Sequence, residues 1–125
     1  MSTVRILMIE DNPQNRYLAT FLLNARGWQV LQAEDGPSGI ALAAQEKPDL
    51  VLLDIQLPGM DGYAVAQALR ACKNLPHLPI VAVTSYAMPG DRERCLQSGC
   101  NGYIEKPIDP ATFADEVARF LEPHP

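Results

Sequence analysis

Side chains capable of chemistry follow four apolar runs of this 125-residue sequence. The most apolar run ends on Asp54, and the first run of the chain ends on Glu10 and Asp11. Two later runs end on Thr84 and just before Lys106. A buried carboxylate without partners is too costly to keep. Asp54 therefore has compensating partners at an open strand end, or it is there to react.

The three acids together predict a cation site. Carboxylates that lie close to one another raise each other's pKa unless a cation sits among them. Oxygen ligands suit Mg²⁺, which prefers octahedral geometry and keeps several waters. If Glu10, Asp11 and Asp54 share one edge of the fold, we expect them to hold Mg²⁺, with Lys106 and Thr84 beside them.

Each of these residues also has a plainer explanation. Glu10 and Asp11 could be acids that favour a helix start, and Asp54 could begin a turn. Thr84 alone could be an ordinary strand residue, and Lys106 alone a solvated charge. Their joint placement at strand ends favours a common site over four separate structural roles.

The elements that position these residues alternate regularly along the chain. Continuous apolar runs predict strands that are covered on both faces, and apolar residues at helical spacing predict the helices between them. The expected strands are 4–9, 28–33, 49–54, 80–85 and 102–105. The expected helices are 13–26, 36–47, 62–71, 89–98 and 110–122. This pattern predicts one domain, residues 1–125, with a doubly wound parallel α/β sheet.

Helix boundaries are predicted from capping residues. Asn12 is the expected N-cap of the first helix, with Pro13 at its first position and Gly27 as its C-cap. Asp109 is the expected cap of the last helix. The apolar residues at helical spacing within the first helix are Tyr17, Leu18, Phe21, Leu22 and Ala25.

Composition and charge exclude several classes of function. Hydrophobic residues make up 47% of the chain and charged residues 20%, which is ordinary for a globular protein. A net charge of −5 argues against binding of nucleic acid by this domain alone. Three cysteines without a CxxC pair predict a reduced, cytoplasmic protein rather than a disulfide or zinc site. No signal peptide, membrane span or nucleotide-binding glycine loop is present.

The sequence resembles a receiver domain of bacterial two-component response regulators, the chemotaxis-receiver-like superfamily. The resemblance covers essentially the whole chain and implies a flavodoxin-like fold with strand order 2-1-3-4-5. The sequence is similar both to stand-alone receivers and to receivers of hybrid histidine kinases, and we expect no output domain of its own. The matching stretches are "ILMIEDNPQNR", "DLVLLDIQLPGMDGYAV", "PIVAVTSYA" and "GCNGYIEKPI".

The resemblance implies a role for each residue at the strand ends. Asp54 would accept a phosphoryl group, and Thr84 and Lys106 would contact that group once it is bound. The Mg²⁺ ligands would be Glu10, Asp11, Asp54 and the main-chain carbonyl of Gln56, with Asp11 binding directly and Glu10 through water.

The resemblance also implies a switch. Tyr103 would turn inward when Thr84 moves, although a half-buried strand aromatic without that role is the alternative. The Lys106–Pro107 peptide bond would be cis. Tyr86, two residues after Thr84, is expected to shield the phosphoryl group and slow its hydrolysis. Ser85 is assigned no role.

The implied partners are proteins. The phosphoryl donor would be a histidine kinase or a histidine phosphotransfer protein, and the output face would lie on 89–98, 102–105 and 110–122. That face would control a downstream protein target and could also form a homodimer. The domain would not be an enzyme, beyond assisting its own phosphorylation and dephosphorylation. The alternatives are a pseudo-receiver that never accepts phosphate and a Mg²⁺-dependent phosphatase of small molecules.

Overall fold

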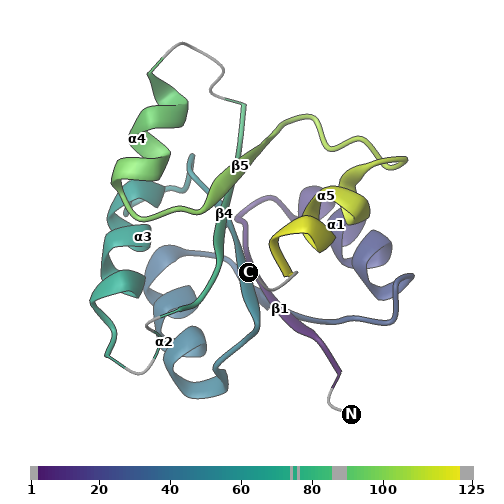
Figure 1. The fold of residues 1–125 in the computed structure, drawn as a ribbon, viewed down its shortest axis with the longest axis horizontal. Coiled ribbons are helices and arrows are strands. Elements are labelled where there is room, and N and C mark those ends of the chain that lie inside the picture. The colour runs from purple at the N-terminus through teal and green to yellow at the C-terminus, as the bar shows by residue number, and fades with distance from the viewer. Residues whose placement is uncertain (1–2, 74, 76, 86–89, 122–125) are drawn as a thin grey trace.

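The computed structural model describes residues 3–73, 75, 77–85 and 90–121. Over these residues, five strands alternate with five helices along the chain, and Figure 1 shows their arrangement. The strands are β1 (Arg5–Ile9), β2 (Gln29–Ala33), β3 (Leu50–Asp54), β4 (Ile80–Thr84) and β5 (Gly102–Glu105). The helices are α1 (Pro13–Asn24), α2 (Gly36–Glu46), α3 (Gly62–Ala71), α4 (Asp91–Gln97) and α5 (Phe113–Leu121). Within these ranges, no helix is long and apolar enough to cross a membrane.

The sheet confirms the predicted topology. All four strand pairings are parallel, and the order is β2-β1-β3-β4-β5. Helices α1 and α5 cover one face of the sheet, and α2, α3 and α4 cover the other (Figure 1). Every residue of β3 and β4 is buried, as expected for strands with helices on both faces. The carboxyl ends of β1, β3 and β4 therefore meet at one edge of the sheet.

The first helix forms where the sequence predicts it, but its exposed face differs from expectation. The side chain of Asn12 accepts hydrogen bonds from the main-chain N–H groups of Gln14 and Asn15, so Asn12 is the N-cap as predicted. The buried residues of α1 are Ala19 and Leu23, whereas Tyr17 is 74% and Phe21 is 63% exposed. Two aromatic residues of the apolar series thus face solvent.

Several element boundaries differ from the predictions by one to three residues, and at the end of α1 and the start of α5 a turn takes the place of the expected helix. Helix α1 ends at Asn24, and Gly27, with φ of +84°, lies in the turn that follows rather than at the C-cap. Strand β4 ends at Thr84. Residues 110–112 form a turn in which the carboxylate of Asp109 accepts a hydrogen bond from the N–H of Ala111, so α5 begins only at Phe113.

Candidate functional site

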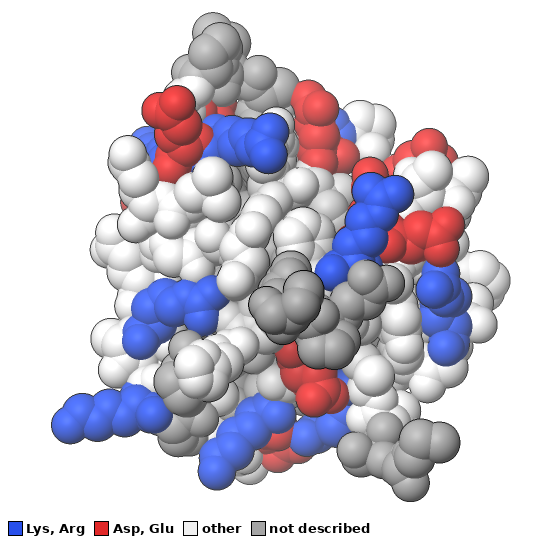
Figure 2. All heavy atoms as spheres, viewed as in Figure 1, with Lys and Arg blue, Asp and Glu red and all other residues white. Residues whose placement is uncertain are grey.

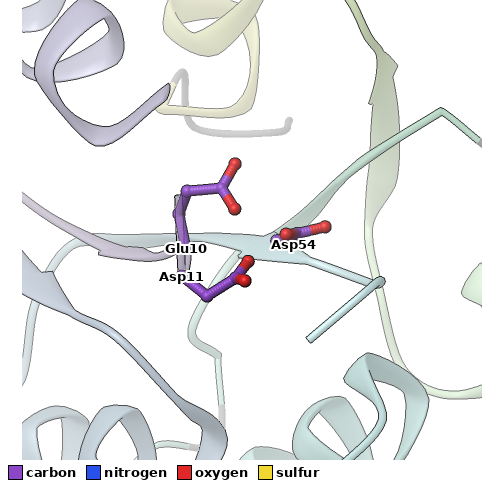
Figure 3. Close-up of side chains that lie close together, drawn as sticks. All are labelled: Glu10, Asp11 and Asp54. Atoms are coloured by element: carbon purple, nitrogen blue, oxygen red, sulfur yellow. The ribbon is translucent and has the colours of Figure 1, made fainter. Parts of the chain in front are cut away.

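The three predicted acids come together at the carboxyl ends of β1 and β3. Glu10 and Asp11 follow β1, and Asp54 is the last residue of β3. Both residues after β1 direct their carboxylates toward the side on which Asp54 lies (Figure 3). One carboxylate oxygen of each acid lies within 4.8 Å of one from each of the others. Glu10 and Asp54 are buried, while Asp11 is exposed to solvent at the mouth of the cluster.

Lys106 connects the two buried acids. Its Nζ lies 2.9 Å from Oε1 of Glu10 and 3.4 Å from Oδ1 of Asp54. The position of Lys106 is fixed from the sheet, because its main-chain N–H donates to the carbonyl of Thr84 over 2.8 Å. Thr84 itself is buried at the end of β4. The structure thus brings together the five residues that the strand ends predict.

The electrostatics of the cluster reflect three charges in a small buried space. Burial raises the pKa of Glu10, the neighbouring Asp54 raises it further, and the bond from Lys106 opposes both. Burial by itself would lower the pKa of Lys106, but the hydrogen bond to Glu10 and the charges of both acids outweigh it and raise that pKa. One ammonium therefore offsets two buried carboxylates, and negative charge is left over.

The second oxygen of Glu10 shows that the described part of the site is short of positive partners. Oε2 of Glu10 is buried and has no hydrogen-bond partner among the described residues. Buried polar atoms are normally paired, and an exception calls for a missing water or ion. A divalent cation among oxygen ligands of this kind would pair it. The residues present therefore fit a bound metal ion.

Comparison with known proteins agrees with this geometry. The sequence model described as "Response regulator receiver domain" matches residues 6–118. The chain belongs to this family. The receiver domain is 39% identical over 119 residues to the polar-differentiation response regulator DivK of Brucella ovis, covering 95% of this chain and 97% of that protein. DivK of Brucella anthropi is 39% identical over 116 residues, covering 93% of this chain and 94% of the relative.

Solved structures are similar in both fold and sequence. The receiver domain of the sensor histidine kinase PA1611 from Pseudomonas aeruginosa has a TM-score of 0.87 and 36% identity, covering 96% of this chain and 98% of that one. That protein has a magnesium ion coordinated in its active-site cleft. The chemotaxis protein CheY4 of Vibrio cholerae has a TM-score of 0.90, covers 95% of this chain and 99% of its own, and shares the fold at 24% identity.

Two contacts in this receiver domain were not predicted from its sequence. Nη1 of Arg16 donates to the main-chain carbonyls of Glu10 and Asp11 over 2.8 and 3.1 Å, which holds the acid pair in place. Ser85, which was assigned no role, donates from its hydroxyl to the side-chain carbonyl of Gln56. This bond joins the loops after β3 and β4. A basic residue one helical turn after an acid pair is the only sequence signal for either contact.

The remaining predicted site residues lie around the cluster. The main-chain N–H of Gln56 donates to Oδ1 of Asp54 over 2.9 Å, so Gln56 lies beside this acid. The role of its carbonyl as a metal ligand stays a prediction. Tyr103 is half-buried on β5. The Lys106–Pro107 bond is cis, as predicted. Tyr86 lies outside the described residues.

Gly62 is packed directly against the strand end that carries Asp54. A Cβ at this position would lie 2.4 Å from Cα of Ile55 and 2.9 Å from the carbonyl oxygen of Asp54. Both atoms belong to the main chain and cannot rotate away. We expect Gly62→Ala to lower the free energy of unfolding, measured in urea, by about 1–3 kcal/mol, which is the cost of overpacking. It should also slow labelling of Asp54, meaning the covalent addition of a phosphoryl group from acetyl phosphate in the presence of Mg²⁺.

Gly27→Ala is the matched control for Gly62→Ala. Gly27 has a φ of +84° but open space around the Cβ position, so alanine brings backbone strain without a collision near the site. This control should lose stability and keep the labelling rate of the unmodified domain. Equal labelling rates in the two variants would show that Gly62 does not position the end of β3.

Proposed function

We propose that this receiver domain accepts a phosphoryl group on Asp54 and uses it as a signalling switch. The observation that carries the proposal is the convergence of Glu10, Asp11 and Asp54 within 4.8 Å, with Lys106 between the two buried acids. Asp11 and Asp54, the carbonyl of Gln56 and, through water, Glu10 would hold Mg²⁺. When bound, this ion supplies positive charge that reduces repulsion between the acids and an incoming phosphoryl group.

The acceptor step needs little from the protein beyond position and charge. A carboxylate oxygen of Asp54 attacks the phosphorus of a phosphohistidine donor and an acyl phosphate forms. The bond from phosphorus to the imidazole nitrogen of the donor breaks in the same step. Lys106 is close enough to both buried acids to move its ammonium onto the new phosphoryl oxygens. We propose that Thr84, at the end of the next strand, offers its hydroxyl to the same group.

The partners follow from membership of the family. A response regulator receiver domain interacts with a histidine kinase and with a downstream target. We propose phosphohistidine, on a kinase or on a phosphotransfer protein, as the donor. The output face comprises α4, β5 and α5, where Tyr103 would respond to movement of Thr84. A second copy of the chain is a further candidate partner for this face, and light scattering with and without beryllofluoride tests it.

Other functions have less support from these residues. A pseudo-receiver is expected to lack part of the acid, hydroxyl and ammonium set, whereas all five side chains are present at one sheet edge. We also propose that the domain is an acceptor that assists its own phosphorylation and dephosphorylation, and is not an enzyme with a separate substrate. Catalytic turnover of generic phosphate esters would contradict this. In the described part of the chain, none of Cys72, Cys95 and Cys100 forms a disulfide, which is compatible with a cytoplasmic location.

The direct test is covalent labelling. Incubation with acetyl phosphate and Mg²⁺ should add one phosphoryl group to the intact protein, detected by mass spectrometry and removed by mild base. Beryllofluoride, which imitates the aspartyl phosphate, should change the NMR signals of Asp54 and Tyr103. Absence of both effects would support a pseudo-receiver.

Magnesium is expected to stabilise the folded domain through the acid cluster. At about 100 times its dissociation constant, a ligand that binds only the folded state adds about 2.7 kcal/mol to the free energy of unfolding. Asp11→Asn should lose most of this gain, because it removes the exposed acid of the cluster. Thermal unfolding with Mg²⁺ and with EDTA measures the effect.

Glu93→Gln is the control for the magnesium prediction. Glu93 is exposed in the first turn of α4, outside the acid cluster. The control should gain as much stability from Mg²⁺ as the unmodified domain does. An equal gain in Asp11→Asn would show that the ion binds elsewhere.

A further inference from the structure

Strand β5 leaves part of its main chain open at the edge of the sheet. It is the last strand in the order, so among the described residues only β4 pairs with it. The N–H of Lys106, just after β5, donates to Thr84 in β4. Within β5, alternate residues face the same neighbour, so the main-chain groups of Gly102 and Ile104 also face β4. The N–H of Asn101, which precedes the strand, donates to Ile80 of β4 as well. The main-chain N–H and C=O groups of Tyr103 and Glu105 therefore face away from the sheet.

A groove runs along this open edge between α4 and α5. Its volume is about 390 Å³. Its lining includes Asn101, all four residues of β5, Arg92 of α4, and Glu116 and Phe120 of α5. A smaller hollow of about 140 Å³ adjoins it and shares several of these residues. In Figure 2, which has the same view as Figure 1, uncharged atoms lie between α4 and α5, with charged side chains of both signs beside them.

The two sides of the groove differ in chemistry. On the α5 side, the ring of Phe120 lies 2.6 Å from the position that a Cβ of Gly102 would take, and Ile104 belongs to the same apolar cluster. Glu116 of α5 adds a carboxylate to this side of the lining. On the α4 side, the guanidinium of Arg92 lies 5.9 Å from the ring centre of Tyr103. In the described part of the chain, no ion pair to Arg92 is formed. An apolar side chain fits the first side, and an acidic side chain fits the second.

An extended backbone is the one shape that satisfies both features of the edge. Its N–H and C=O groups would pair with those of Tyr103 and Glu105, which a helix could not do because its own are already bonded. Its side chains would alternate between the two sides of the groove, since successive residues of a strand point to opposite faces.

We propose that the target of this domain binds as an added β-strand along β5, through a segment that alternates apolar and acidic residues. The apolar side chains contact Phe120 and Ile104, and the acidic side chain pairs with Arg92. The role of this segment as a signalling target rests on the proposed function, since Tyr103 belongs both to the open edge and to the switch. The contact itself depends only on the geometry of β5.

The test uses the full chain and a synthetic peptide, acetyl-Thr-Val-Asp-Val-Thr-amide. Titration followed by NMR should show binding by the beryllofluoride-treated domain with a dissociation constant of about 1 mM or tighter. The amides of Tyr103 and Glu105 should exchange with solvent about tenfold more slowly at saturation, a change of about 1.4 kcal/mol. The same peptide N-methylated at every residue should not bind. No binding by the first peptide, or equal binding by both, overturns the proposal.

Two variants of Glu105 separate the main chain from the side chain. Glu105→Pro removes an N–H that faces the open edge, where proline is tolerated, and should weaken peptide binding by about tenfold or more. Glu105→Ala keeps the N–H and should bind as the unmodified domain does. Equal binding by the two variants overturns strand addition. If Glu105→Pro does not fold, Arg92→Gln replaces it as the test. The unmodified domain should bind the peptide with aspartate more tightly than the same peptide with lysine at that position, and Arg92→Gln should bind the two peptides equally.

The remaining outcomes distinguish other occupants and the proposed function. Protection of the same amides that grows with protein concentration, without peptide, would assign the edge to a second copy and overturn the proposal. Labelling of Asp54 is measured separately by mass. Peptide binding at β5 in a domain that takes no phosphoryl group would therefore contradict the proposed function and leave the strand contact standing.

Discussion

Asp54→Asn is expected to abolish phosphorylation of this domain. The substitution keeps the size and shape of the side chain, but an amide oxygen is a far weaker nucleophile than a carboxylate and carries no charge for Mg²⁺. We expect incorporation from acetyl phosphate to fall by at least about 100-fold, the loss of about 2.7 kcal/mol of transition-state stabilisation or more. Intact-mass spectrometry over a time course measures it.

Asp61→Asn is the matched control for the loss of labelling. Asp61 is the N-cap of α3, where its side chain accepts a hydrogen bond from the N–H of Ala64. Asparagine caps as well as aspartate does, so the control removes one carboxylate near the site and leaves the fold and the acid cluster intact. It should label at the rate of the unmodified domain. Normal labelling of Asp54→Asn would place the acceptor on another residue and refute the proposed function.

The sequence predicts the acid cluster well because parallel topology leaves little freedom. Once strands alternate with helices, the strands run parallel, and parallel strands have all their carboxyl ends at one edge of the sheet. Glu10, Asp54 and Thr84 then have to meet, whatever the details of the loops. The same reasoning places Lys106 nearby, because it follows the last strand at that edge.

The direction of long side chains could not be predicted in this way. Lys106 lies closer to Glu10 than to Asp54, since its Nζ balances two acids whose separation depends on packing of the whole core. Arg16 bends back to donate to the carbonyls of Glu10 and Asp11, because α1 starts directly after them. The spacing of these residues in the sequence does not predict the direction of the arginine side chain. Such contacts depend on distances of a few tenths of an ångström.

Apolar periodicity was a poorer indicator of burial in α1. Tyr17 and Phe21 fall at helical spacing with Leu18 and Leu22, but the sheet accepts only the narrow face around Ala19 and Leu23. A helix that packs on one side of a sheet buries a limited arc, and a wider apolar series must leave some members exposed. The start of α5 was missed for a different reason. An aspartate such as Asp109 caps a turn as readily as a helix, so the residue type does not tell whether a turn or a helix follows it.

Lys106→Met should destabilise the domain strongly when no metal is present. The substitution keeps an apolar stem of similar length and leaves Glu10 and Asp54 buried without their shared cation. Removing one partner of a buried ion pair costs about 3–5 kcal/mol, because the remaining charge is uncompensated. Urea unfolding at neutral pH in EDTA measures the loss. Lys73→Met, at an exposed position, is the control and should change stability by less than about 0.5 kcal/mol.

The pH dependence of Lys106→Met has a definite sign. The pKa of Glu10 is already raised in the folded domain, mainly by burial, and loss of the ammonium should raise it further. A group with a raised folded pKa favours the fold below its unfolded pKa and loses that contribution as pH rises through the folded value. The stability difference between Lys106→Met and the unmodified domain should therefore shrink on acidification and be largest at neutral pH.

A second substitution identifies the charge responsible. Glu10→Gln in the Lys106→Met background removes the buried carboxylate that the lysine holds, and should restore most of the lost stability. Glu10→Gln alone leaves Lys106 paired with Asp54 and should cost much less than the lysine variant does. The two effects should be strongly non-additive, because the residues are in direct contact. Additive effects would mean that Glu10 and Lys106 are not electrostatically coupled. The argument that a bound cation neutralises the excess negative charge of the buried acids would then have no basis.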